Sequence, residues 1–197
     1  MLYDPYKHHR RSTRLKGYDY TQPGAYFVTI CTRIRECSLG EITDGIMQLS
    51  EYGQITLNFW SEITPHFPCA TIPIFVIMPN HVHAIIVIQD TVGRGVVTTP
   101  LPTPIDIDNR EKTSLGGETR PLPGLGQIVA YYKYHTTKQI NAINANPGTR
   151  FWQRNYYEHI IRNERELHAI RTYIQNNPLK WDLDQDNPSN PATGTLG

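Results

Sequence analysis

Two apolar runs on either side of Pro79-Asn80 constrain the fold more than any other part of the sequence. Residues 74–78 (Ile-Phe-Val-Ile-Met) and residues 81–88 (His-Val-His-Ala-Ile-Ile-Val-Ile) are rich in β-branched side chains, and each has the length of one strand. The Pro-Asn pair between them favours a tight connection. We therefore expect two buried strands paired antiparallel, at the centre of a β-sheet.

The rest of the sequence predicts another strand, a hairpin and three helices. Residues 26–32 are dense in β-branched and aromatic side chains and predict the strand, and Asp44-Gly45 is a hairpin signal between two short apolar segments. Apolar residues at helical spacing predict helices over 49–63, 125–144 and 163–177. The last helix begins at Asn163 with Glu166 three residues later, which resembles a capping box, and it stops before Pro178.

This order of elements predicts one α+β domain, with an antiparallel sheet and helices packed mainly on one face. We expect a polar N-terminal arm over residues 1–24, a catalytic domain over 25–182 and a polar acidic tail over 183–197. Residues 90–124 are rich in glycine and proline and have no periodicity, so they are interpreted as a flexible insertion in that domain.

Composition excludes several classes of protein. With 197 residues, 39% hydrophobic and 19% charged, the chain is long enough for a real core and is not of disordered composition. The longest apolar run, 84–88, is too short to cross a bilayer, and no apolar stretch follows the N-terminus as in a secretory signal. Three widely spaced cysteines favour a reducing compartment over a disulfide framework. We expect a cytoplasmic protein with no membrane partner.

The net charge of +1 conceals two basic clusters and the acidic tail. The first cluster lies in the arm, and the second lies between residues 150 and 180. Several of the twelve tyrosines lie beside these cations, and cations interleaved with aromatic rings suit single-stranded nucleic acid. An ordinary solvated surface is the alternative. The candidate DNA-binding residues are Arg10, Arg11, Arg14, Lys16, Lys133 and Arg154.

His81 and His83 form the first candidate site. Side chains two residues apart on a strand point to the same face, so both imidazoles can reach one ion. Each ring would need a polar partner in a core, and a buried pair at this spacing suggests metal ligands as readily as structural histidines. Two ligands are too few for a metal site, so a third must come from another element.

Tyr173 and Asn177 are the candidates on the last helix. They lie four residues apart on the flank of its apolar stripe, so a phenol and an amide should face the sheet side by side. An amide oxygen can bind a divalent cation, and a tyrosine beside that cation could become a phenolate that attacks a phosphodiester. Alternatively, Tyr173 is a half-buried helix residue and Asn177 a C-terminal cap.

The sequence gives less support to other catalytic mechanisms. There is no Gly-x-x-x-x-Gly-Lys-Ser/Thr phosphate loop and no Gly-x-Ser-x-Gly nucleophile elbow. Tyr156 and Tyr157 are rival nucleophiles in a segment interpreted as extended, and Trp152 and Trp181 are interpreted as packing anchors.

Several of these segments resemble the REP-associated tyrosine transposases and the related IS200-like Y1 transposases of the HUH endonuclease superfamily. Residues 78–86 are similar to the His-hydrophobic-His strand of that group, and 151–164 to the run before its nucleophile. The other matching segments are residues 14–20, 24–32 and 173–178.

The resemblance implies a ferredoxin-like fold that acts on single-stranded DNA beside a hairpin. His81 and His83 would hold Mg²⁺ or Mn²⁺, and Tyr173 would attack phosphorus to leave a 5′-phosphotyrosine link and a free 3′-OH. Related insertion-sequence transposases have a metal-binding Gln four residues after the nucleophile, where this chain has the shorter Asn177. A homodimer is one of the assemblies found among relatives, and nucleoid association would follow from DNA binding.

The sequence is also compatible with two alternative functions. One is a metal-dependent hydrolase that uses His81 and His83 with an activated water and does not need Tyr173. The other is a hairpin-binding module that keeps the fold without the chemistry.

Overall fold

The fold is built around a four-stranded antiparallel sheet. The computed structural model describes residues 17–90, 123–184 and 186–190. The sheet has the strand order β4-β5-β1-β6, with bounds β1 Gly24–Cys31, β4 Ala70–Ile77, β5 His81–Ile88 and β6 Tyr157–Ile161. A hairpin and two helices lie between β1 and β4, and one helix lies between β5 and β6, which gives the β-α-β-β-α-β order of ferredoxin-like folds. The predicted α+β, ferredoxin-like domain is confirmed.

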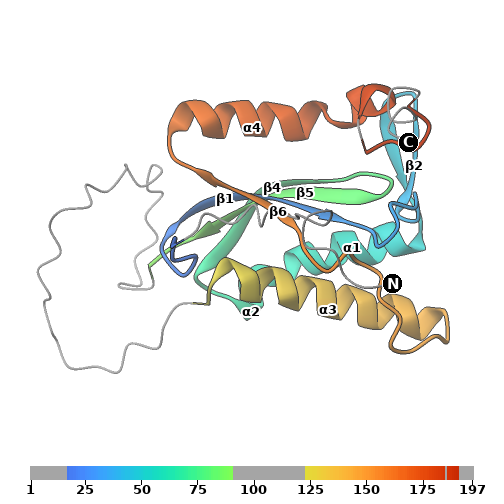
Figure 1. Cartoon of the computed structure of the whole chain (residues 1–197), viewed down its shortest axis with the longest axis horizontal. Coiled ribbons are helices and arrows are strands. Elements are labelled where there is room, and N and C mark those ends of the chain that lie inside the picture. The colour runs from blue at the N-terminus through green and yellow to red at the C-terminus, as the bar shows by residue number, and fades with distance from the viewer. Residues whose placement is uncertain (1–16, 91–122, 185, 191–197) are drawn as a thin grey trace, which may run out of the picture.

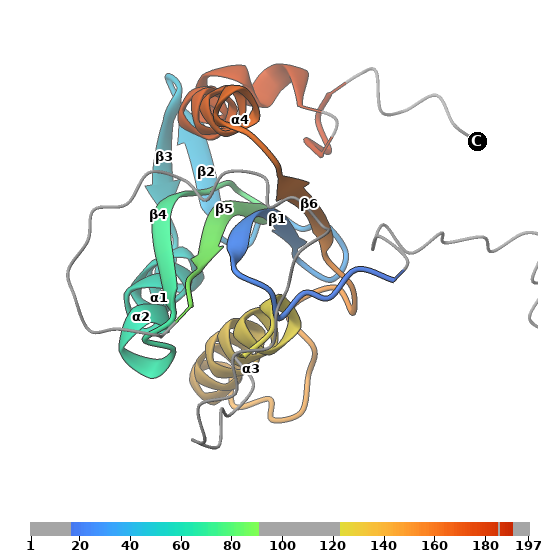
Figure 2. The same ribbon diagram turned by 90° about the vertical axis from the view of Figure 1, so that its left-hand side faces the viewer.

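Helices cover both faces of this sheet, but unequally. Figure 1 shows α1 (Glu51–Ser61), α2 (Ile63–His66) and α3 (Leu125–Ile143) beneath the sheet, and α4 (Glu164–Asn176) above it. The view turned by 90° separates α3 and α4 in the same way (Figure 2). The prediction of helices mainly on one face is confirmed, and the exception is the helix that carries the candidate nucleophile.

The central strands follow the sequence patterns closely. The strand β5 has the predicted bounds, and it pairs antiparallel with β4, which begins four residues before the predicted start. The predicted hairpin is β2 (Gly40–Thr43) with β3 (Ile46–Leu49). Its turn residues Asp44 and Gly45 have φ angles of 52° and 74°, as a two-residue turn with both central residues in the left-handed region requires.

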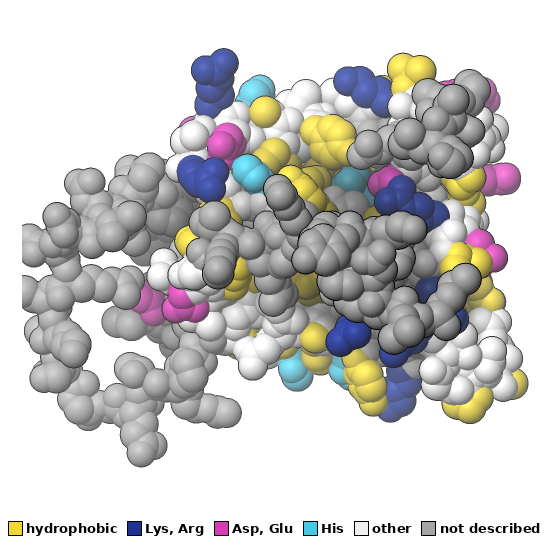
Figure 3. Space-filling model, viewed as in Figure 1, with side chains coloured by type: hydrophobic (Ala, Val, Ile, Leu, Met, Phe, Trp, Pro, Cys, Tyr) yellow, Lys and Arg dark blue, Asp and Glu magenta, His cyan; other side chains and the backbone are white. Residues whose placement is uncertain are grey.

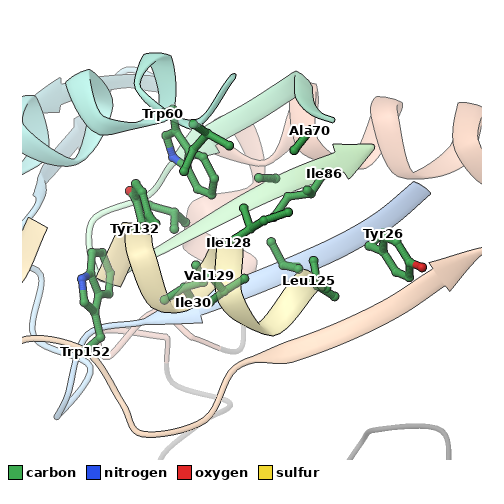
Figure 4. Packing of buried hydrophobic residues seen from close by; sticks show 14 of the residues in the cluster. Tyr26, Ile30, Trp60, Ala70, Ile86, Leu125, Ile128, Val129, Tyr132 and Trp152 are labelled. Carbon is green, nitrogen blue, oxygen red and sulfur yellow. The ribbon is translucent and has the colours of Figure 1, made fainter. Parts of the chain in front are cut away.

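The main core lies between the sheet and the lower helices (Figure 4). The rings of Trp60 and Tyr132 stack with centroids 4.1 Å apart, and the Tyr132 hydroxyl donates to the Thr56 carbonyl at 3.1 Å. The indole N–H of Trp152 donates to the Thr136 hydroxyl at 2.8 Å. The polar atoms of Tyr132 and Trp152 are thus satisfied within the core, whereas the buried indole nitrogen of Trp60 has no hydrogen-bond partner among the described residues. These aromatic side chains hold α1 and α3 against the sheet.

The chain does not leave the domain at Pro178. It forms a 3₁₀ helix, η1 (Pro178–Leu183), and then a segment whose Asn187 is buried and donates to the Trp181 carbonyl at 3.0 Å. The Gly45 turn packs against Leu179, so the β2–β3 hairpin supports η1 from the side. Part of the predicted acidic tail is thus folded against the domain.

The predicted arm is partly described. Tyr18 and Tyr20 pack against the main core, and the Leu125 N–H donates to the Tyr20 carbonyl at 3.0 Å. Residues 1–16 of the arm and 91–122 of the predicted insertion lie outside the described residues. Within the described part of the chain, no helix combines the length and apolar character that a membrane span requires.

Candidate active site

Strand register brings the two histidines to the α4 face of the sheet. On β5, Val82 and Ala84 belong to the main core, whereas Ile85 packs in the smaller cluster beneath α4. His81 and His83 have the same alternation as Ile85 and are buried to 0% and 4% exposure. Their Nε2 atoms lie 3.0 Å apart, so both rings present the same nitrogen to one point.

The other nitrogen of each ring has a polar partner. The Nδ1 of His81 lies 2.8 Å from the Asn80 amide oxygen, and the Nδ1 of His83 lies 2.8 Å from the Thr29 hydroxyl. The Asn80 amide nitrogen donates to the carbonyls of Arg35 and Asp186, which fixes its oxygen toward the ring. An amide oxygen can only accept, so His81 carries its proton on Nδ1 and its Nε2 has a free lone pair.

Burial keeps both imidazoles neutral at physiological pH. It lowers the pKa of His81 well below the usual value, and the neighbouring His83 and Arg35 lower it further. It also lowers the pKa of His83 to about 3. Neutral imidazole is the form that binds metal ions, so these two side chains are already in the protonation state of ligands.

Tyr173 meets the histidine pair from α4. Its hydroxyl lies 3.2 Å from His83 Nε2, and its ring packs edge-on against Phe27 with centroids 6.0 Å apart. The side chain is 45% exposed, so the hydroxyl stands at an opening between the buried pair and solvent. Burial and the negative charge of Asp184 raise the pKa of Tyr173, whereas a hydrogen bond with the Asn177 side chain lowers it.

Asn177 continues the helical geometry, with φ −59° and ψ −45°, and thus lies one turn after Tyr173. Its side chain is buried to 2% exposure, and its amide oxygen has no hydrogen-bond partner among the described residues. A buried unpaired oxygen costs free energy, which a bound cation would remove. No group of three or more His, Cys, Asp or Glu in the described ranges is placed to hold a metal ion.

The segment after α4 brings further residues close to the histidine pair and Tyr173. Trp181 is buried with its ring centroid 6.1 Å from that of His81, which agrees with its interpretation as a packing anchor. Asp184 is near enough to Tyr173 to raise its pKa, and burial raises the pKa of Asp184 itself. The Arg35–Asp186 ion pair holds this segment beside Asn80. Nothing in the spacing of these residues indicates their proximity to β5.

The rival tyrosines are placed differently. Tyr156 packs against the main core, on the far side of the sheet from α4. Tyr157 opposes Thr29 on β6 and is 47% exposed, with its ring 6.2 Å from that of Phe27. It is therefore on the same face as Tyr173.

Of the predicted DNA-binding residues, the structure describes Lys133 and Arg154, which lie next to each other. The Lys133 ammonium donates to the carbonyls of Gln153 and Arg154 at 2.6 and 3.1 Å, on the α3 side of the sheet. The Arg154 side chain is exposed nearby. Arg10, Arg11, Arg14 and Lys16 lie outside the described residues.

A curated relative and a solved structure that are similar to this chain both bear the name REP-associated tyrosine transposase. A protein of Haemophilus influenzae, provisionally named a REP-associated tyrosine transposase, is 25% identical over 170 residues, 82% of this chain and 74% of the relative. The solved structure of a REP-associated tyrosine transposase bound to a REP hairpin is similar over 85% of this chain and 73% of that chain, with 19% identity and a TM-score of 0.49. No family model matches the sequence. The resemblance to the REP-associated tyrosine transposases is confirmed.

A nearer relative defines the family. Another Haemophilus influenzae protein, described as uncharacterised, is 41% identical over 182 residues, which cover 90% of this chain and 93% of the relative. The chain belongs to the same family as that protein.

Proposed function

We propose that this protein is a metal-dependent, transposase-like endonuclease and strand transferase that acts on single-stranded DNA next to hairpins, with Tyr173 as its nucleophile. The observation that carries the proposal is the contact between the Tyr173 hydroxyl and His83 Nε2 at 3.2 Å, with His81 Nε2 a further 3.0 Å away. A potential nucleophile thus stands directly at two neutral imidazoles that face one point. The name of the 25% identical relative supports the same activity.

The donor set fits a divalent cation. His81 and His83 would hold Mg²⁺ or Mn²⁺ through Nε2, and Asn177 would supply its unpaired amide oxygen. When bound, the cation supplies positive charge that polarises the scissile phosphate and favours the phenolate of Tyr173. Thr29 and Asn80 orient the two rings from behind, as partners of metal-binding histidines usually do.

The covalent step uses the oxygen of Tyr173. This oxygen forms a bond to phosphorus and the bond from phosphorus to the 3′ oxygen breaks, so a 5′-phosphotyrosine and a free 3′-OH result. The phenol gives up its proton and the departing 3′ oxygen gains one, so the number of protons is unchanged. Attack by a 3′-OH on the phosphotyrosine reverses the step and joins strands. The phosphodiester energy is kept, so the absence of a phosphate loop in the sequence is no obstacle.

Covalent capture tests the proposal. The protein is mixed with labelled hairpin DNA from the flanks of its own gene, with single-stranded tails and Mn²⁺, and the products are separated on a denaturing gel. We expect a labelled band at the mass of the protein that disappears with EDTA and in Tyr173→Phe. Tyr157→Phe is the matched control, because this exposed tyrosine shares the α4 face and should leave the band intact.

Other outcomes are equally informative. A band that survives Tyr173→Phe would reject this nucleophile, and cleavage without any covalent band would favour a hydrolase with an activated water. Hairpin binding with neither product would favour a binding module. Asn177→Ala tests the third donor separately: we expect the Mn²⁺ concentration needed for half-maximal capture to rise about tenfold or more.

A further inference from the structure

A second concave site lies on the opposite side of the sheet from Tyr173. An open cavity of about 790 Å³ is formed by the C-terminal half of α3 and the segment that follows it, residues 145–154. Its volume is in the range of about 300–1,000 Å³ that is typical of pockets for small organic ligands. The cavity has room for at least one nucleotide, and none of the contacts of the candidate active site involves it.

The cavity combines cations with aromatic rings. It is lined by Lys133, Lys138, Arg150 and Arg154 together with Tyr134, Phe151 and Trp152, and no acidic residue is among the described residues that line it. Among the described residues, no ion pair involves Lys138, Arg150 or Arg154. Figure 3 shows Lys and Arg side chains gathered over α3 with hydrophobic side chains beside them. Free cations around an apolar wall suit a ligand with both phosphate and base.

The wall of the cavity is held in a fixed position. The Lys133 ammonium donates to two carbonyls of the wall, and the Asn141 amide donates to the Thr149 carbonyl at 2.8 Å. The Gln153 N–H donates to the Cys31 carbonyl at 2.9 Å, which attaches the wall to the end of β1. A preformed wall needs little ordering when a ligand binds, which favours affinity.

This attachment also connects the cavity to the candidate active site. Cys31 pairs with His81, so the wall and the histidine pair lie at the same end of the sheet. From Arg154 the chain continues through Asn155 into β6, which is an edge strand, and reaches Tyr157 on the α4 face. Among the described residues, Arg154, Asn155 and Tyr157 are exposed along this stretch of chain, which runs at the sheet edge between the two sites.

We propose that this cavity binds the single-stranded DNA that adjoins the cleaved phosphate, with a base against Tyr134 and Phe151 and phosphates on Lys138, Arg150 and Arg154. The inference rests on the proposed function and extends it by a second DNA site. Double-stranded DNA does not fit this arrangement, because its bases are stacked inside the helix and cannot reach an aromatic wall.

The test measures the affinity that a single-stranded tail adds to a hairpin. Fluorescent hairpins from the flanks of the gene carry a tail of about four or about sixteen nucleotides, spanning the usual site sizes for single strands. For wild-type protein we expect the long tail to bind at least about tenfold more tightly. In the double variant Lys138→Ala, Arg150→Ala this ratio should fall to about one, and the salt dependence should become shallower by about 1.4 for two lost phosphate contacts. The charge-preserving control Lys138→Arg, Arg150→Lys should retain the ratio.

Photocrosslinking locates the tail independently. With 5-iodouracil in the long tail, we expect crosslinked peptides that contain Tyr134 or Phe151. An unchanged ratio in the double variant, crosslinks confined to other peptides, or competition by polyglutamate as strong as by oligothymidylate would each overturn the proposal. Covalent capture is scored on the same hairpins. Tail binding through the cavity without any phosphotyrosine would support this inference and contradict the proposed function.

Discussion

Thr29 is the hydrogen-bond partner that allows His83 to carry its proton on either ring nitrogen. Its hydroxyl lies 2.8 Å from His83 Nδ1 and can either donate or accept. His81 Nε2 is an acceptor, so the proton between the two Nε2 atoms belongs to His83, and Thr29 donates to Nδ1. If His83 Nε2 held a cation, as we propose, the proton would be on Nδ1, and the same hydroxyl would accept it. A hydroxyl thus allows both forms of the ring without rearrangement.

Thr29→Val should weaken metal binding because it removes this partner with little change in shape. We expect the Mn²⁺ requirement for covalent capture to rise about 10- to 100-fold, the usual effect of losing such a partner. The free energy of unfolding should fall by about 1–3 kcal/mol, because His83 Nδ1 is left buried and unpaired. Thr29→Ser keeps the hydroxyl and is the control; equal metal requirements in both variants would contradict the role of Thr29.

Sequence reasoning could find some residues of the site and not others. His81 with His83, and Tyr173 with Asn177, share spacings that place them on one face of a strand or helix. Thr29 could not be found in this way, because the register of β1 with β5 brings it to His83 across 54 positions of sequence. Asp184 was missed because its proximity to Tyr173 depends on the 3₁₀ helix after Pro178.

At the scale of elements, α4 is the helix that positions Tyr173. Its start was predictable: the Asn163 side chain accepts from the Glu166 N–H at 2.8 Å. The Glu166 carboxylate accepts from the Arg162 N–H at 2.8 Å, one residue earlier than in a standard capping box. Its apolar stripe packs Leu167 and Ile174 against the sheet. That α4 packs on this face of the sheet, opposite α1 and α3, could not be predicted from the periodicity, because periodicity identifies the buried stripe of a helix but not the surface that it packs against.

Asn163→Ala should destabilise the protein by about 0.5–2 kcal/mol, because the first turn of α4 loses its cap. Urea unfolding measures this loss. Asn163→Asp is the control, since a carboxylate also accepts from Glu166 N–H and is favourable at a helix N-terminus. Equal losses for Ala and Asp would show that the cap does not stabilise α4.

The contact of α3 with the segment before β6 should make stability depend on pH. Burial lowers the pKa of Lys133 from 10.5 to about 8, so between these values the unfolded chain binds a proton that the folded chain does not. The contribution of Lys133 to the free energy of unfolding should therefore rise as the pH increases from about 8 to about 10.5. Urea unfolding at about pH 7 and about pH 10 compares wild type with Lys133→Met. The free energy of unfolding of Lys133→Met should lack this rise with pH. An identical pH dependence in both proteins would contradict the prediction.

For the whole molecule, the sequence patterns predicted the fold class and the order of elements because the central strands are rich in β-branched and other apolar residues and each long helix has an apolar stripe. They did not reveal that residues of the predicted arm and of the predicted tail pack against the folded domain. Tyr18 and Tyr20, in the predicted arm, pack against the core, and Asn187, in the predicted tail, is buried beside Trp181. Such contacts come from isolated residues without periodicity, so they become visible only in three dimensions.

These contacts define where the arm can be cut to test its predicted role in binding hairpins. Removal of residues 1–16 takes away Arg10, Arg11, Arg14 and Lys16 but keeps the contacts of Tyr18 and Tyr20 with the core. If all four cations contact phosphates, the salt dependence of hairpin affinity should become shallower by up to about 3 on single strands. Fluorescence titration over a range of salt concentrations measures this slope. The full-length variant with the four cations changed to Gln is the matched comparison and should show the same loss. Undiminished affinity with an unchanged slope in both would reject the arm as a DNA-binding element, and the cations of the folded domain would then account for hairpin binding.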